Sequence, residues 1–114
     1  MIKIVFALLT LSTTSAVAND LAEWNPPSQY DRPYHGQLIE RSLSPHLVDG
    51  ACQSLFAKHG FKSIGGKMRG CAYHKDNTCW IIYINKQHGK SSPAAVRRHE
   101  IGHCNGWQAN HSED

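Results

Sequence analysis

The chain has 114 residues, with a formal net charge of +3 at pH 7, and 40% of its residues are hydrophobic. This length predicts a single small domain with a limited core. The basic residues are scattered along the chain and form no cluster with interleaved aromatic rings. The composition therefore argues against nucleic-acid binding.

The first eighteen residues have the three regions of a secretory signal peptide. Lys3 follows the initiating methionine, residues 4–11 form an apolar run, and Ala16-Val17-Ala18 matches a cleavage site. The apolar run is too short to span a bilayer, so we expect no stable membrane anchor. Residues 1–18 therefore predict export, to the periplasm or outside the cell.

Residues 19–44 form a proline-rich and polar arm without a clear hydrophobic period. Prolines favour extended backbone, so we expect an extended or partly disordered segment. Two other interpretations remain open. Trp24, Tyr30 and Tyr34 would pin the arm across the domain, or the arm would occupy an active cleft as an inhibitory segment.

Residues 45–114 read as an α+β unit. Ser44-Pro45 and Gly60 mark the start and end of a helix whose apolar residues recur at helical spacing. Residues 61–73 are rich in glycine and predict a strand, possibly broken in two, and 74–77 predict a turn. Residues 79–84 are β-branched and aromatic and predict the best strand of the chain. A polar loop over 85–92 then leads to a second helix.

The chain contains four cysteines, which are Cys52, Cys71, Cys79 and Cys104. An even number in an exported chain predicts two disulfide bonds, which would compensate for the small core. A four-cysteine zinc site is disfavoured because no Cys-x-x-Cys pair is present. Three pairings are possible. In one of them Cys71 and Cys79 would cross-link the predicted hairpin, leaving Cys52 to pair with Cys104.

The second predicted helix carries the sequence His-Glu-x-x-His at residues 99–103. Ser92 and Pro93 mark its start, and Gly106 can take the positive φ that ends a helix. Positions i and i+4 share one helix face, so His99 and His103 would present two imidazoles to one point. Two such nitrogens are characteristic of a catalytic zinc site, with Glu100 beside the metal.

A plainer interpretation of the same residues is an amphipathic terminal helix with surface histidines. Three neighbours of the motif have plain roles. Gly102 is interpreted as a packing feature, Trp107 as a cover over the helix end, and Cys104 as a disulfide partner rather than a ligand.

The order helix, short antiparallel sheet and His-Glu-x-x-His helix resembles the zincin metallopeptidases. This resemblance implies a small zincin-like domain with the active helix packed under the sheet. It also implies that an edge strand pairs with extended substrate. The candidate for this role is the 79–84 strand or its partner.

The pattern His-Glu-x-x-His-x-x-Gly looks like the metzincin branch, in which a third histidine follows three residues after the glycine. This chain has Ala109 there, so it departs from that pattern. We expect a longer loop to return His111 to the metal as the third ligand. Glu113 and Asp114 are weaker ligand candidates.

The resemblance implies a zinc-dependent peptidase that holds one zinc ion per chain and acts on a peptide or protein substrate. Glu100 would be the general base that takes a proton from a zinc-activated water. Tyr83 or His88 would steady the developing oxyanion. The first alternative is a non-catalytic, zinc-bound interaction module of the same fold. The second is a disulfide-stabilised binding protein without metal.

Overall fold

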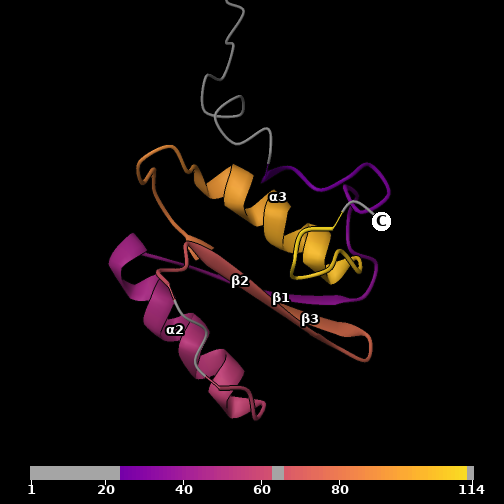
Figure 1. The fold of residues 1–114 in the computed structure, drawn as a ribbon, viewed down its shortest axis with the longest axis horizontal. Helices are drawn as coiled ribbons and strands as arrows, with labels where there is room; N and C mark the ends of the chain where they lie inside the picture. The colour runs from indigo at the N-terminus through magenta and orange to yellow at the C-terminus, as the bar shows by residue number, and fades with distance from the viewer. Residues whose placement is uncertain (1–23, 63–65, 113–114) are drawn as a thin grey trace, which may run out of the picture.

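The computed structural model describes residues 24–62 and 66–112. The predicted signal peptide, Glu113 and Asp114 lie outside these residues. The chain forms two helices and a three-stranded sheet in an α+β arrangement (Figure 1). In chain order the elements are β1 (Gln37–Leu43), α2 (Pro45–Lys58), β2 (Gly70–Lys75), β3 (Thr78–Ile84) and α3 (Pro93–Cys104).

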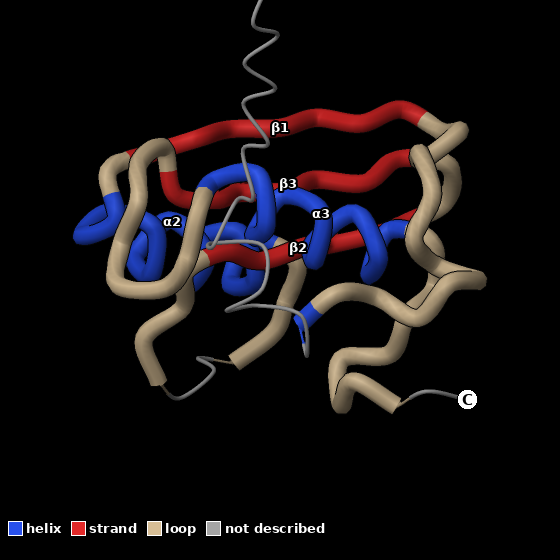
Figure 2. The backbone as a smooth tube through the Cα atoms, turned by 90° about the horizontal axis from the view of Figure 1, so that it is seen from above, coloured by secondary structure: helices blue, strands red, loops and turns tan. Residues whose placement is uncertain are grey.

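The sheet has the strand order β1-β3-β2, with β3 in the centre (Figure 2). β2 pairs antiparallel with β3, whereas β1 pairs parallel with it, Gln37 lying opposite Thr78. The sheet is therefore mixed, not the purely antiparallel sheet or hairpin that we expected. Helix α3 lies on one face of the sheet and α2 on the other (Figure 1).

Strand β1 is the element that the sequence did not indicate, since residues 37–43 fell within the proline-rich arm. All seven of its residues pair with β3. Its burial pattern shows why the strand was missed: none of its residues is fully buried, and Ile39 is 39% exposed. An edge strand of this kind lacks the alternation of apolar and polar residues that marks a half-buried strand.

Helix α2 has nearly the predicted bounds. Pro45 occupies the first turn, and Gly60, with φ of 85°, follows the end of the helix. The Ser44 hydroxyl makes no capping hydrogen bond, so only the proline part of the start signal is used. Val48 and Cys52 are buried against Cys71, Ile82 and Ile84, the last two of which belong to β3. A second apolar cluster lies on the α3 side and contains Cys79, Ile81 and Cys104.

The glycine-rich stretch forms a shorter strand than predicted, because β2 begins only at Gly70. Before it, the backbone N–H of Met68 donates to Asp49 Oδ1 at 3.0 Å. The predicted turn shrinks to Asp76 and Asn77, and Asp76 takes a positive φ of 55°.

The disulfides are Cys52–Cys71 and Cys79–Cys104. The pairing of Cys71 with Cys79 is therefore wrong. Cys71 lies opposite Ile82, three residues from Cys79 on the same strand, and successive side chains of a strand alternate between faces. Cys71 therefore points towards α2, whereas Cys79 points towards α3.

Each disulfide thus ties one helix to the sheet. Two disulfides are compatible with an extracellular location. Within the part of the chain that the structure describes, no helix is long and apolar enough to cross a membrane.

We expect peptide mapping of the unreduced protein to recover the linked pairs Cys52–Cys71 and Cys79–Cys104. Replacing both Cys79 and Cys104 by alanine should lower the free energy of unfolding by about 3 kcal/mol, because the bridge closes a loop of 25 residues. Urea denaturation measures this change. Recovery of a Cys71–Cys79 peptide would contradict the fold.

An ion pair fastens β1 to α3 and makes stability depend on pH. Arg97 donates to both carboxyl oxygens of Glu40, at 2.9 and 3.1 Å, and the Tyr83 hydroxyl donates to the same group at 2.7 Å. The hydrogen bond from Arg97, then that from Tyr83, lowers the pKa of Glu40 from 4.5 to about 2.

Because the folded pKa is depressed, the stabilisation is present above about pH 4.5 and is lost as the pH falls towards 2. Glu40→Gln should remove this part of the pH dependence, which for a solvent-exposed pair amounts to at most about 1 kcal/mol. Urea titrations of both proteins across this pH range test the assignment. Identical pH dependence in the two proteins would contradict it.

Candidate metal centre

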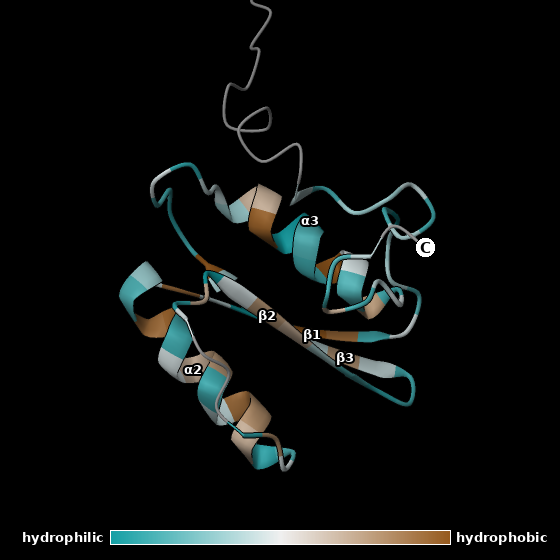
Figure 3. Cartoon of the chain, in the orientation of Figure 1, coloured by the Kyte–Doolittle hydropathy of each residue, from teal (hydrophilic) through white to brown (hydrophobic). Residues whose placement is uncertain are grey.

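Both ends of α3 are fixed by local hydrogen bonds, as the sequence predicted. At the start, the Ser92 hydroxyl oxygen accepts a hydrogen bond from the backbone N–H of Ala95 at 3.1 Å, and Pro93 begins the helix. The middle of α3 is hydrophilic (teal in Figure 3), although the helix packs on the sheet. His99 and His103 lie one turn apart in this polar part of the helix.

The end of α3 has the hydrogen bonds of a Schellman motif. The N–H of Trp107 donates to the carbonyl of Gly102, and the N–H of Gly106 to that of His103, both at 3.1 Å. Gly106 has φ of 104°, a conformation that favours glycine. This turn folds Trp107 back against the helix, where it is buried and its ring stacks on His103 with centroids 4.7 Å apart.

His111 returns to the two helical histidines, as we expected from the longer loop. Its Nε2 lies 3.0 Å from Nε2 of His99, and Nε2 of His103 lies 3.2 Å from the same atom. The three candidate ligand atoms all lie within 4.8 Å of one another. His99 is buried, His103 half-buried and His111 exposed, so the cluster opens to solvent on one side.

The hydrogen bonds at the other ring nitrogens decide which tautomers are present. Nδ1 of His99 lies 2.7 Å from the carbonyl oxygen of Trp24, and Nδ1 of His103 lies 2.8 Å from that of Trp107. A carbonyl only accepts hydrogen bonds, so each Nδ1 carries the proton. In the neutral rings both Nε2 atoms then carry lone pairs, and these face each other across 3.2 Å.

Facing lone pairs repel, and a cation between them removes the repulsion. A histidine that donates its second ring N–H to a backbone carbonyl is also the usual arrangement around protein-bound metals. Burial lowers the pKa of His99 to about 4 and also lowers that of His103, which favours the neutral rings that metals bind. The three histidines therefore form a group that could hold a metal ion.

Glu100 lies beside this group but is not part of it. It is 4% exposed, and its carboxyl group has no hydrogen-bond partner among residues 24–62 and 66–112. Burial raises the pKa of Glu100 from 4.5 to about 8. Gly70 of β2 makes room for it, since a Cβ there would lie 3.2 Å from Glu100 Cγ and 2.5 Å from Val96 Cγ1.

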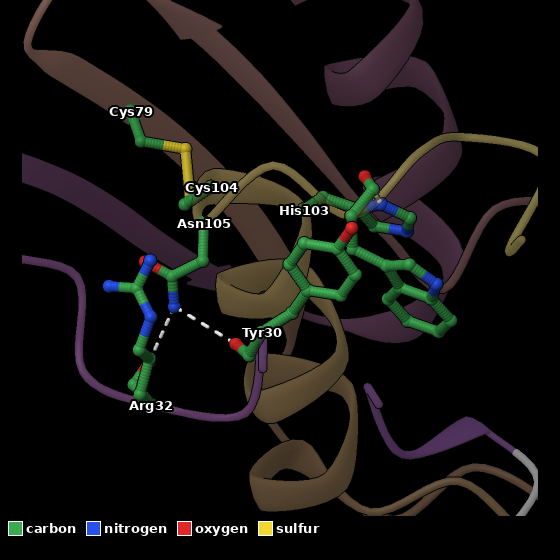
Figure 4. The surroundings of a disulfide bond; sticks show 7 residues. Tyr30, Arg32, Cys79, His103, Cys104 and Asn105 are labelled. Atoms are coloured by element: carbon green, nitrogen blue, oxygen red, sulfur yellow. Dashed lines mark hydrogen bonds between the residues drawn. A yellow bond between two sulfur atoms is a disulfide. The ribbon is translucent and has the colours of Figure 1, made fainter. Parts of the chain in front are cut away.

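Other expected residues lie away from the cluster. The Tyr83 hydroxyl is bound to Glu40, and His88 belongs to a loop bridge with Ser91, so neither joins the histidines. Cys104 is bonded to Cys79 (Figure 4) and is no ligand. Strand β3 is paired on both sides and has no free edge, which leaves its partner β2 as the edge strand nearer Glu100.

Sequence reasoning did not find the Trp24 carbonyl, because any residue supplies a backbone carbonyl and nothing in a sequence marks it. Trp24 had entered only as a possible anchor of the arm. Comparisons with protein-family models, with curated proteins and with solved structures found no match.

Proposed function

We propose that the protein is a small exported zinc-dependent metallopeptidase, with His99, His103 and His111 as zinc ligands and Glu100 as general base. One observation carries the proposal. The Nε2 atoms of His99 and His103 converge with His111, while a backbone carbonyl holds each Nδ1.

Zinc suits this donor set better than other common metals. Neutral imidazole nitrogens suit zinc, whereas calcium and magnesium prefer oxygen ligands. Three protein ligands leave a fourth position for water, as in catalytic rather than structural zinc sites. The exposure of His111 supports access of water from that side.

When bound, zinc would make its water more acidic and polarise the substrate carbonyl. Glu100 would accept the proton of that water and deliver it to the leaving amine of the peptide. Its position one residue after His99, outside the ligand group, supports the role of a base rather than a ligand. The edge strand β2 would hold an extended peptide by backbone pairing, in place of the expected β3.

A non-catalytic, zinc-bound interaction module is the second candidate. It is favoured by the burial of Glu100, which is only 4% exposed. Three surface clefts of about 440–480 Å³ are also lined by residues other than the histidines and Glu100. In this case the zinc would stabilise the fold, and Glu100 would have no chemical role.

Purified mature protein should bind about one zinc per chain, and His103→Ala should abolish stoichiometric binding. Elemental analysis after dialysis against zinc measures the content. His88→Ala is the matched control and should keep the zinc, because the His88 loop pairs with Ser91 through its backbone. Wild-type protein without zinc would refute both candidate functions.

Glu100→Gln should keep the zinc but lower peptide hydrolysis by at least about 100-fold, because glutamine has the same shape and accepts no proton. Cleavage of an unfolded protein and of a broad peptide library, followed by mass spectrometry, measures the rate. Wild-type protein that binds zinc yet cleaves nothing would favour the non-catalytic module. A Glu100→Gln variant with full activity would remove Glu100 from the mechanism.

A further inference from the structure

Residues 24–36, which we call the arm, run along α3 beside the histidines, and the carbonyl of Trp24 contacts His99. We propose that the arm is a working part of the metal centre: its seat on α3, at Gly102, positions His99 and so sets the affinity for metal. This inference rests on the proposed metal site.

The seat is a notch that only glycine leaves open. A Cβ at Gly102 would lie 2.4 Å from Cγ and 2.7 Å from Cβ of Pro26, distances at which atoms overlap. Pro26 is buried in this notch. Glycine within a helix costs about 1 kcal/mol relative to alanine. Here that cost is accompanied by a close contact between arm and helix, two residues from the carbonyl that His99 needs.

Two further contacts hold the arm along the same side of α3. The Asn105 side-chain amide donates to the carbonyls of Tyr30, at 3.0 Å, and Arg32, at 2.6 Å (Figure 4). The guanidinium of Arg98 pairs with the Asp31 carboxylate, with Nε 2.9 Å from Oδ1.

Arg98, Gly102 and Asn105 follow the i, i+4, i+7 spacing, so they form one stripe on the helix. The arm therefore lies in a continuous line of contacts next to the face that carries His99 and His103. This line fixes where the arm passes the helix.

The arm acts on the metal through Trp24. The Trp24 carbonyl oxygen lies 2.7 Å from His99 Nδ1, and its ring packs on the His99 ring with centroids 4.9 Å apart. Together these contacts fix the tautomer and the rotation of the imidazole. A displaced Pro26 would carry Trp24 with it, and His99 would lose the partner that aims its Nε2 at the cluster. Loss of such a partner typically lowers metal affinity by about 10–100-fold.

Gly102→Ala tests the inference, because the added methyl group overlaps Pro26. We expect zinc affinity, measured by competition with a chromophoric chelator, to fall by about 10–100-fold. Adding Pro26→Gly removes both overlapping atoms and should restore most of the affinity. Gly50→Ala is the matched control in α2, where an added Cβ meets nothing within 4 Å, and it should leave zinc affinity unchanged.

A second measurement separates this inference from the proposed function. In metal-free protein, nitrogen-15 NMR of the neutral imidazoles should show His99 with its proton on Nδ1. Gly102→Ala should shift His99 towards a mixture of tautomers, and the double variant should restore the single form.

Wild-type protein with a fixed tautomer but no zinc binding would refute the proposed function and leave the arm's role intact. Gly102→Ala with wild-type zinc affinity and wild-type tautomer would overturn the inference. So would a loss of affinity that Pro26→Gly fails to restore.

Discussion

Two backbone carbonyls hold the helical histidines, and the rest of the candidate site depends on them. The Trp24 carbonyl accepts from Nδ1 of His99, and the Trp107 carbonyl accepts from Nδ1 of His103. Each bond leaves an Nε2 lone pair aimed at the same point, where His111 adds a third nitrogen. The carbonyls come from opposite sides of α3, one before the sheet in the chain and one after the helix, so the site needs both flanking segments in place.

A small domain must keep these segments in position with a limited core. The Cys79–Cys104 bridge ties the last residue of α3 to the central strand, next to His103 and to the turn that delivers Trp107. The Cys52–Cys71 bridge ties α2 to β2 on the other face. Gly70 lets Val96 and Glu100 approach β2 closely, and Gly102 does the same for Pro26. Cross-links and close contacts thus do work that a larger apolar core does in larger domains.

Much of the architecture could be predicted from local signals. Proline and serine at a helix start, glycine after its end, and a β-branched run gave α2, β3 and α3 nearly their observed bounds, and the His-x-x-x-His spacing together with Gly106 brought His111 into consideration. What could not be predicted depends on contacts distant in sequence. Strand β1 has an exposed, irregular pattern and exists because β3 pairs with it. The disulfide pairing follows from the β2–β3 register, which the cysteine spacing does not contain.

X-ray absorption spectroscopy of the zinc-loaded mature protein tests the central claim most directly, because it counts the atoms bound to the metal. The proposed site predicts three imidazole nitrogens and one lighter oxygen at about 2.0–2.1 Å, with no sulfur. The His111→Ala variant should show two imidazoles. A wild-type spectrum with two imidazoles or fewer, or with sulfur at about 2.3 Å, would contradict the three-histidine centre.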